Sequence, residues 1–128
     1  AISQLSMVDG NNGYDTVSIT GLGAGNTLTD KGLDGTDMAG LFRDIEEIDL
    51  TGTDLTGGDT FDFSNEDIET MTDGDNILTL SIDLGTIDIN DIGLSFSGGA
   101  TGYTLDDSVA NSRTVTWDNG TQLVINGT

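Results

Sequence analysis

The excess of acidic side chains constrains this chain more than any other feature of its sequence. The 128 residues include 23 Asp and Glu against three Lys and Arg, with no His, so the formal net charge is -20. A folded body this small carries strong self-repulsion unless its carboxylates are neutralised. Alternating apolar residues argue against a disordered chain, so we expect bound cations. Asp in turns rich in Gly and Asn favours Ca²⁺, the predicted cofactor.

Short segments that alternate polar and apolar residues recur along the chain and predict half-buried β-strands. They lie at residues 15–20, 47–51, 60–64, 77–84, 86–90, 94–97, 113–117 and 121–125. The dipeptide Asn119-Gly120 between the last two segments is a strong hairpin signal. One helix is expected from Asp37 to Ile45, because Asp37 is a candidate N-cap and the apolar residues after it share a face at helical spacing.

The pattern predicts one all-β domain over residues 1–128. We expect two packed sheets, a β-sandwich that is partly β-roll-like, with one short helix. Parallel, roll-like pairing is expected in the first half and antiparallel hairpins in the second. The chain has no Cys, so a bound metal would take the stabilising role that disulfides have in other small domains. No apolar run approaches the roughly 18 residues of a membrane span.

The segment Gly10–Ser18 fits the calcium-binding nonapeptide G-G-x-G-x-D-x-U-x, with Asn11 in place of the second Gly. In that motif the glycines turn the backbone so that carbonyl groups and the Asp point at Ca²⁺, and the apolar position enters a parallel β-roll. Oxygen donors also alternate here, at Asp9, Asn11, Gly13 and Asp15. An Asx-rich turn before a strand, without metal, is the alternative interpretation.

Two further acidic clusters are candidate calcium sites, because carboxylates this close repel one another unless a cation or proton lies between them. Asp73 and Asp75 flank a glycine before a strand, and Asp54 and Asp59 bracket a Gly-Gly pair. The alternative for each cluster is a solvated acidic surface. The predicted metal ligands are therefore Asp9, Asn11, Gly13, Asp15, Asp73, Asp75, Asp54 and Asp59.

The composition argues against catalysis and against nucleic-acid binding. A nucleophilic triad lacks its His, and the glycine-rich segment at residues 21–26 lacks the Lys that a phosphate-binding loop needs. Paired carboxylates suffice for glycoside hydrolysis, but that chemistry needs an aromatic-lined cleft, and the chain has one Trp. A nucleic acid would be repelled by the acidic surface. We therefore predict that the protein is not an enzyme.

The string FRDIEEIDLTGT, residues Phe42–Thr53, resembles a stretch found in modules of large RTX adhesins. Those are calcium-dependent bacterial surface proteins exported by type I secretion. In that family a glycine-rich turn and strand come first, as residues 10–19 do here. A run like Asn76–Leu80 follows, and a hairpin like residues 114–125 closes the module. This chain departs from the family in lacking tandem nonapeptides. The resemblance implies a secreted module at the bacterial cell surface.

The sequence therefore predicts a calcium-stabilised extracellular module with a structural or adhesive function, in a bacterial surface adhesin or biofilm matrix fibre. Its expected partners are neighbouring modules or subunits of the same protein, and cell-surface or matrix polysaccharide. One alternative is a self-assembling filament subunit, in which residues 1–8 form a donor or edge segment added to a neighbour's sheet. Another is a calcium-dependent carbohydrate-binding module, in which Trp117 or Tyr103 stacks on a sugar. For Trp117, core packing is the competing interpretation.

Overall fold

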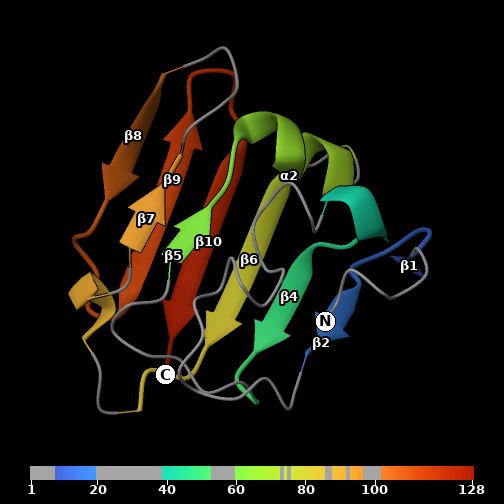
Figure 1. Cartoon of the computed structure of the whole chain (residues 1–128). Helices are drawn as coiled ribbons and strands as arrows, with labels where there is room; N and C mark the ends of the chain where they lie inside the picture. Colours follow the sequence, from blue (N-terminus) through green and yellow to red (C-terminus); the bar gives the residue numbers. More distant parts are fainter. Residues whose placement is uncertain are drawn as a thin grey trace.

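The computed structural model of the chain has a mixed six-stranded sheet covered on one face by a smaller sheet and a helix (Figure 1). It describes residues 8–19, 39–52, 60–72, 74, 76–85, 88–91, 93–96 and 102–128. The strands of the large sheet are, in spatial order, β2 (Thr16–Ser18), β4 (Glu47–Leu50), β6 (Ile77–Ile82), β10 (Gln122–Gly127), β9 (Ser112–Trp117) and β8 (Tyr103–Asp106). The prediction of an all-β fold with two packed sheets is confirmed.

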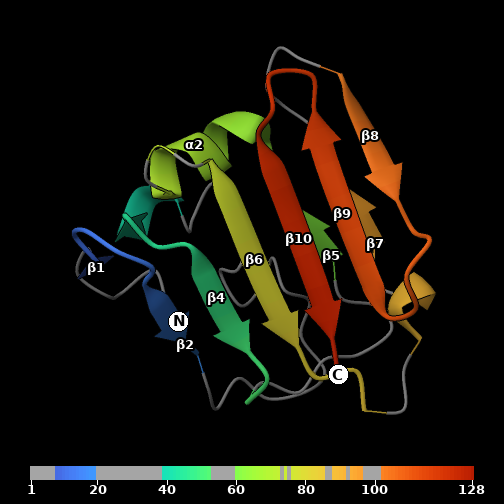
Figure 2. The same ribbon diagram turned by 180° about the vertical axis from the view of Figure 1, so that it is seen from behind.

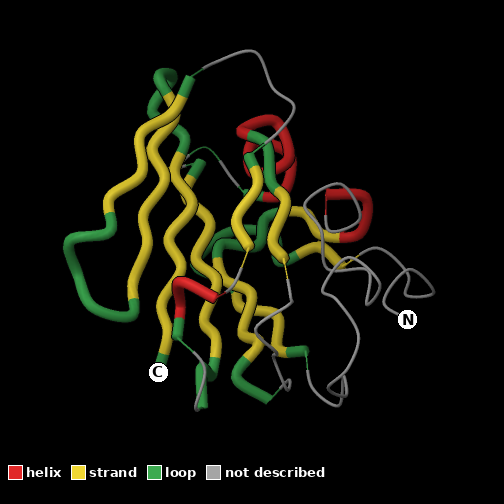
Figure 3. The backbone as a smooth tube through the Cα atoms, turned by 60° about the vertical axis from the view of Figure 1, so that its left-hand side comes forward, coloured by secondary structure: helices red, strands yellow, loops and turns green. Residues whose placement is uncertain are grey.

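The remaining elements are short. Two parallel pairs form separate small sheets, β1 (Val8–Asp9) with β3 (Phe42–Arg43), and β5 (Thr60–Asp62) with β7 (Gly93–Ser95). The helices are α2 (Asn65–Met71) and the 3₁₀ helix η2 (Ile89–Asp91), and residues 39–41 are also helical. Figure 3 shows β5 and β7 alongside α2, in a layer apart from the large sheet. No helix in the described ranges is long and apolar enough to cross a membrane.

The first half of the chain winds as a parallel coil. Thr16 pairs with Glu47, and Glu47 pairs with Thr79, so the chain returns to the large sheet after 31 and then 32 residues. The described residues 8–19, with β1 and β2, are called the first coil, and residues 39–52, with β3 and β4, the second coil. Strand β10 then adds in parallel to β6, and β9 and β8 follow it as antiparallel neighbours. Parallel pairing early and antiparallel pairing late is the arrangement that the sequence pattern predicts.

Rows of apolar side chains run across the strands on the covered face of the large sheet. Val17, Ile48, Leu80 and Ile125 occupy paired positions on four neighbouring parallel strands. The last three are buried, while Val17 at the edge is partly exposed. Because strand side chains alternate, a shift of one residue would turn each strand's apolar set to the wrong face. Figure 2 views the opposite face of the sheet, which carries polar residues such as Ser81.

Helix α2 closes one end of the core, although no helix was predicted there. Ser64 is its N-cap: its hydroxyl accepts from Asp67 N at 3.2 Å, while the Asp67 carboxylate accepts from Ser64 N at 2.9 Å. This reciprocal capping box satisfies backbone donors at the helix start. Ile68 and Met71 then pack into the core with no exposed surface. Along the chain, the helix connects β5 of the small sheet to β6 of the large sheet.

The carboxylate of Glu69 ties this helix to the C-terminal hairpin. Its Oε1 accepts from the Thr121 hydroxyl at 3.0 Å and from the Asn119 side-chain amide.

The hairpin predicted at Asn119-Gly120 is confirmed. Trp117 N donates to Thr121 O at 2.9 Å, and Gly120 takes a φ of 92° in a three-residue turn. That left-handed backbone explains the glycine, because side chains disfavour positive φ.

The helix predicted from Asp37 to Ile45 is wrong beyond residue 41. Residues 39–41 are helical, but Phe42 and Arg43 form β3, and Asp44 has a φ of 54° that no helix accommodates. Pairing with β1 and complete burial of Phe42 outweigh a short helical periodicity that is weak on its own. Residues 37 and 38 lie outside the described ranges.

The strand predicted at residues 86–90 is wrong where the structure describes it. Residues Ile89–Asp91 form η2, and the Asp88 carboxylate accepts from Asn90 N at 2.9 Å. An Asp side chain that bonds the backbone two residues on stabilises a turn in place of a strand. Residues 86 and 87 lie outside the described ranges.

Truncating the centre of the apolar row should destabilise the whole sheet. Leu80 is fully buried between Ile48 and Ile125, so Leu80→Ala should lower the free energy of unfolding by about 2–5 kcal/mol. Urea denaturation measures this change. Ser81→Ala, on the opposite face of the same strand, is the control and should change stability by less than about 0.5 kcal/mol. Equal effects from both variants would contradict the assigned register.

Candidate functional site

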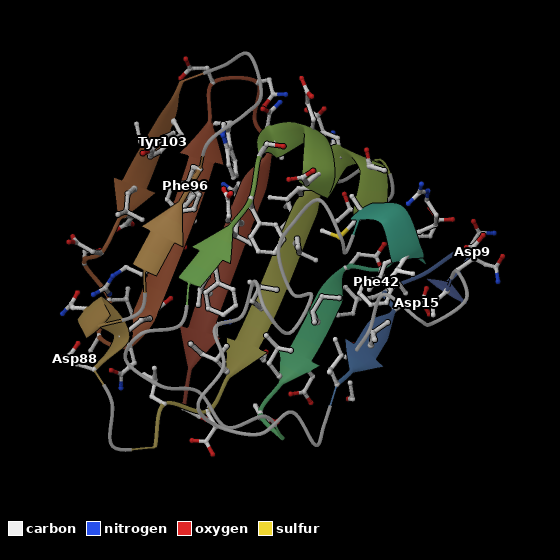
Figure 4. All side chains as sticks on the ribbon, viewed as in Figure 1. Asp9, Asp15, Phe42, Asp88, Phe96 and Tyr103 are labelled. Carbon is white, nitrogen blue, oxygen red and sulfur yellow. The ribbon has the colours of Figure 1, made fainter. Side chains whose placement is uncertain are left out.

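The predicted calcium turn lies at one edge of the large sheet, between β1 and β2 (Figure 4). Its backbone bends through two left-handed residues, with Asn11 at a φ of 63° and Gly13 at 108°. The exposed Asp9 carboxylate accepts from Asn11 N at 2.8 Å, which makes an Asx turn. Asp9 therefore shapes the turn, and its carboxylate faces solvent.

Gly10 packs against the second coil so closely that no other residue fits. A Cβ atom there would lie 2.3 Å from the carbonyl oxygen of Asp44 and 2.7 Å from the carboxyl carbon of Asp15. Gly10 N also donates to Arg43 O at 2.9 Å. The close approach brings the Asp15 carboxyl group and the Asp44 carbonyl near the same point, at the corner where the first coil meets the second.

Hydrogen bonds in both directions join Asp15 to Glu46 at this corner. Asp15 N donates to Glu46 Oε2 at 2.7 Å, while Asp15 O accepts from the backbone N of Glu46 and of Glu47, both at 3.1 Å. These bonds extend the pairing of Thr16 with Glu47 by one residue. Asp15 and Glu46 are therefore neighbours on adjacent parallel strands.

Both residues stand at core-facing positions of the sheet. Side chains alternate along a strand, so Glu46 shares its face with Ile48, and Asp15 shares its face with Val17. Level with Glu46 on the next strand is Leu78, which is fully buried. Two acidic residues thus begin a row that continues with leucine, and Glu46 is only 4 % exposed.

One carboxylate oxygen of each residue is buried without a hydrogen-bond partner, Asp15 Oδ2 and Glu46 Oε1. Burying a charged oxygen without a partner is costly, and two carboxylates side by side add repulsion. Arg43, the cationic residue nearest in the sequence, donates to the backbone oxygens of Ala39 and Phe42. The corner therefore offers oxygen atoms of the kind that Ca²⁺ accepts as ligands.

Of the eight predicted metal ligands, the structure describes four, and only one of these lies at the corner. Asp15 is partly buried at the corner, whereas Asp9, Asn11 and Gly13 lie on the exposed side of the turn. Within the described ranges, no group of three or more acidic side chains comes together to hold a metal. The other four predicted ligands lie outside those ranges: Asp54, Asp59, Asp73 and Asp75.

Glu46 is the residue that the sequence interpretation missed, although its signal was present. In the segment Glu46-Glu47-Ile48-Asp49-Leu50, Glu46 has the same parity as Ile48 and Leu50, which are both fully buried. An acidic residue with core-facing parity is unusual and could have been recognised.

The outer face beside the corner carries exposed polar contacts between the first two coils. Hydrogen bonds from the side chain and backbone of Thr51, and from the Ser18 hydroxyl, hold the pKa of Asp49 below its ordinary value of 3.8. The Tyr14 hydroxyl donates to Glu47 Oε1 at 3.1 Å. Partial burial, followed by the Glu47 carboxylate, raises the pKa of Tyr14, and a hydrogen bond with Thr79 opposes that rise.

The two aromatic residues considered for sugar stacking differ sharply in solvent exposure. Trp117 is 1 % exposed and cannot present its ring to a ligand, so the core-packing interpretation holds for it. Tyr103 at the β8 edge is 49 % exposed, and Phe96 packs edge-on against both rings at centroid distances of 5.0 and 5.9 Å. Figure 4 shows Tyr103 and Phe96 far from Asp15, toward the opposite edge of the sheet.

Comparison with known proteins found no matching family model, no similar curated protein and no similar solved structure. The geometry of the corner and the charge of the chain are therefore the guides to its function.

Replacing Gly10 by Ala should disrupt the corner, because the added methyl group would overlap the Asp44 carbonyl oxygen. We expect a loss of about 1–3 kcal/mol in unfolding free energy, measured by urea denaturation. The control is Gly40→Ala, where the added Cβ would meet no atom within 4 Å beyond its chain neighbours and its own helix backbone. If Gly10→Ala is as stable as Gly40→Ala, the close contact between the coils is wrong.

The lowered pKa of Asp49 gives a prediction for acid titration. Its ionised form is favoured in the folded state, so the stabilisation is present above pH 3.8 and is lost as the pH falls through the folded pKa. Thr51→Ala removes the largest cause and should raise the Asp49 pKa toward 3.8. NMR titration of the carboxyl carbon measures the shift, and an unchanged Asp49 pKa in the variant would contradict the assignment.

Proposed function

We propose that this protein is a calcium-stabilised extracellular module with a structural or adhesive function, in a bacterial surface adhesin or a biofilm matrix fibre. The observation that carries the proposal is the corner where the Gly10–Ser18 turn enters a parallel coil and buries unpartnered carboxylate oxygens of Asp15 and Glu46. A glycine-rich turn with an Asp before a short parallel strand is the arrangement that the resemblance to RTX adhesins implies.

The charge balance supports a cation requirement. Three Lys and Arg cannot neutralise 23 Asp and Glu. The guanidinium group of Arg113 is also buried, where it donates to the backbone oxygen of Ser112 and to the side-chain oxygen of Asn90. Calcium bound to the native state would remove part of the repulsion that opposes folding.

A structural role fits the architecture better than catalysis does. In a parallel coil each turn buries its apolar face against the next, which produces an extended scaffold whose turns stack along one axis. Such a scaffold suits a module that transmits force or spaces binding surfaces. We propose that the protein is not an enzyme and that its partners are neighbouring modules of the same protein and matrix or cell-surface polysaccharide.

The two alternatives have less support. Of the donor segment at residues 1–8, the structure describes Val8, which pairs with Phe42 of its own chain. Because Val8 pairs within its own chain, this residue is a weaker candidate for donation to a neighbour. The carbohydrate-binding alternative loses Trp117 to the core and retains Tyr103, the exposed aromatic residue at the β8 edge.

Calcium should raise the melting temperature of the protein, because a ligand that binds only the native state stabilises it. At a hundredfold excess over the dissociation constant, the gain is about 2.7 kcal/mol. Differential scanning calorimetry in chelator and in millimolar Ca²⁺ measures this effect.

Magnesium and sodium chloride at matched ionic strength are the controls. They should stabilise the protein less than Ca²⁺ does, because a specific Ca²⁺ site distinguishes between cations, whereas simple screening does not. Melting curves that do not differ between chelator and Ca²⁺ would contradict the proposed function.

A further inference from the structure

We propose that Asp15 and Glu46 form a Ca²⁺ site that clamps the first coil of the chain onto the second. This inference depends on the proposed calcium requirement and assigns it to one corner of the fold. Glu46 is outside the nonapeptide-like segment and lies 31 positions after Asp15, so the site joins two separate turns of the coil.

Register places the two carboxyl groups together. Asp15 and Glu46 precede the paired residues Thr16 and Glu47, and neighbouring strands lie about 4.8 Å apart. Both side chains have core-facing parity, and the bond from Asp15 N to Glu46 Oε2 fixes one oxygen of the glutamate. The other oxygen, Oε1, is buried without a partner, and so is Oδ2 of Asp15 on the adjacent strand.

A second observation supports a ligand at this point. Glu46 is 96 % buried, yet it keeps a carboxylate where the next strand of the same row has Leu78. If the row served packing alone, an apolar residue would satisfy it without an unpaired charge. A buried acidic side chain with an unpartnered oxygen is explained if that oxygen contacts a cation.

The donor chemistry favours Ca²⁺. The corner offers two carboxylates, and the Asp44 carbonyl oxygen approaches the same region through its contact with Gly10. Calcium accepts carboxylate and carbonyl oxygens in flexible geometry, whereas Mg²⁺ demands a nearly ideal octahedron and dehydrates reluctantly. Water would complete the coordination of Ca²⁺ at this edge of the sheet.

The proposed clamp has a consequence for the first coil. Strand β2 is three residues long, and Val17 at its centre is only partly buried, so Ile19 is the fully core-packed apolar side chain among the described residues of this coil. Without a cation, repulsion between Asp15 and Glu46 acts directly against its docking. With Ca²⁺ bound, the same two groups attract a common partner and hold the coils together.

The test compares wild-type protein with Glu46→Gln by isothermal titration with CaCl₂ and by calorimetric melting. The substitution keeps an oxygen that can accept from Asp15 N but removes the charge. We expect the Ca²⁺ affinity of this site to fall at least tenfold. Glu66→Gln, at an exposed position in the first turn of α2, removes the same charge and should leave calcium binding unchanged.

Stability in chelator separates a ligand from a merely structural residue. If Glu46 is a ligand, Glu46→Gln should be at least as stable as wild type in chelator, because the repulsion is relieved, and should gain little from Ca²⁺. If Glu46→Gln is destabilised equally in chelator and in Ca²⁺, Glu46 is only structural and the inference is overturned.

Two other outcomes also overturn it, and they bear differently on the proposed function. If Ca²⁺ stabilises wild type, Glu46→Gln and Glu66→Gln equally, the site lies elsewhere while the calcium-stabilised module stands. If wild-type protein shows neither Ca²⁺ binding by isothermal titration nor a change in melting temperature with Ca²⁺, the calcium requirement fails as well.

Discussion

Stacking of parallel strands in register is the constraint on which this structure depends. A single turn of such a coil cannot bury its apolar side alone, so each turn is stable only against its neighbours. Ile48 and Leu80 meet across β4 and β6 because the chain returns after 32 residues with the same parity. Each successive turn therefore needs an apolar residue at the matching position and a connection that returns the chain to the same level of the sheet.

The first coil meets this requirement least well, and there the fold and the proposed function are linked. Among the described strands, β2 has one neighbour in the large sheet, β4, and the pairing brings Asp15 to a position level with the buried Glu46. Apolar stacking draws this coil to the sheet, while electrostatic repulsion opposes it. The balance depends on what neutralises the two carboxylates, so the edge of the coil would respond to the cation content of its surroundings.

Much of the fold could be predicted from local pattern, because alternation and turn residues act over short distances. The strand Ile77–Ile82 and the turn at Asn119-Gly120 are of this kind. The strand at Phe42 could not be predicted, since it exists through pairing with Val8, 34 positions away. The chain has no exact repeat to reveal that spacing. Asp15 was predicted as a site residue, but Glu46 becomes its neighbour only when the register is known.

Hydrogen exchange measured by mass spectrometry, in chelator and in Ca²⁺, tests the central claim most directly, because it shows which part of the chain the cation holds. Ca²⁺ should slow exchange mainly in peptides covering residues 8–19 and 43–47, with little change in the hairpin at residues 112–127. Protection spread evenly over the chain would indicate a diffuse counter-ion effect. Uniform protection, or none in residues 8–19, would contradict the calcium clamp between the first two coils.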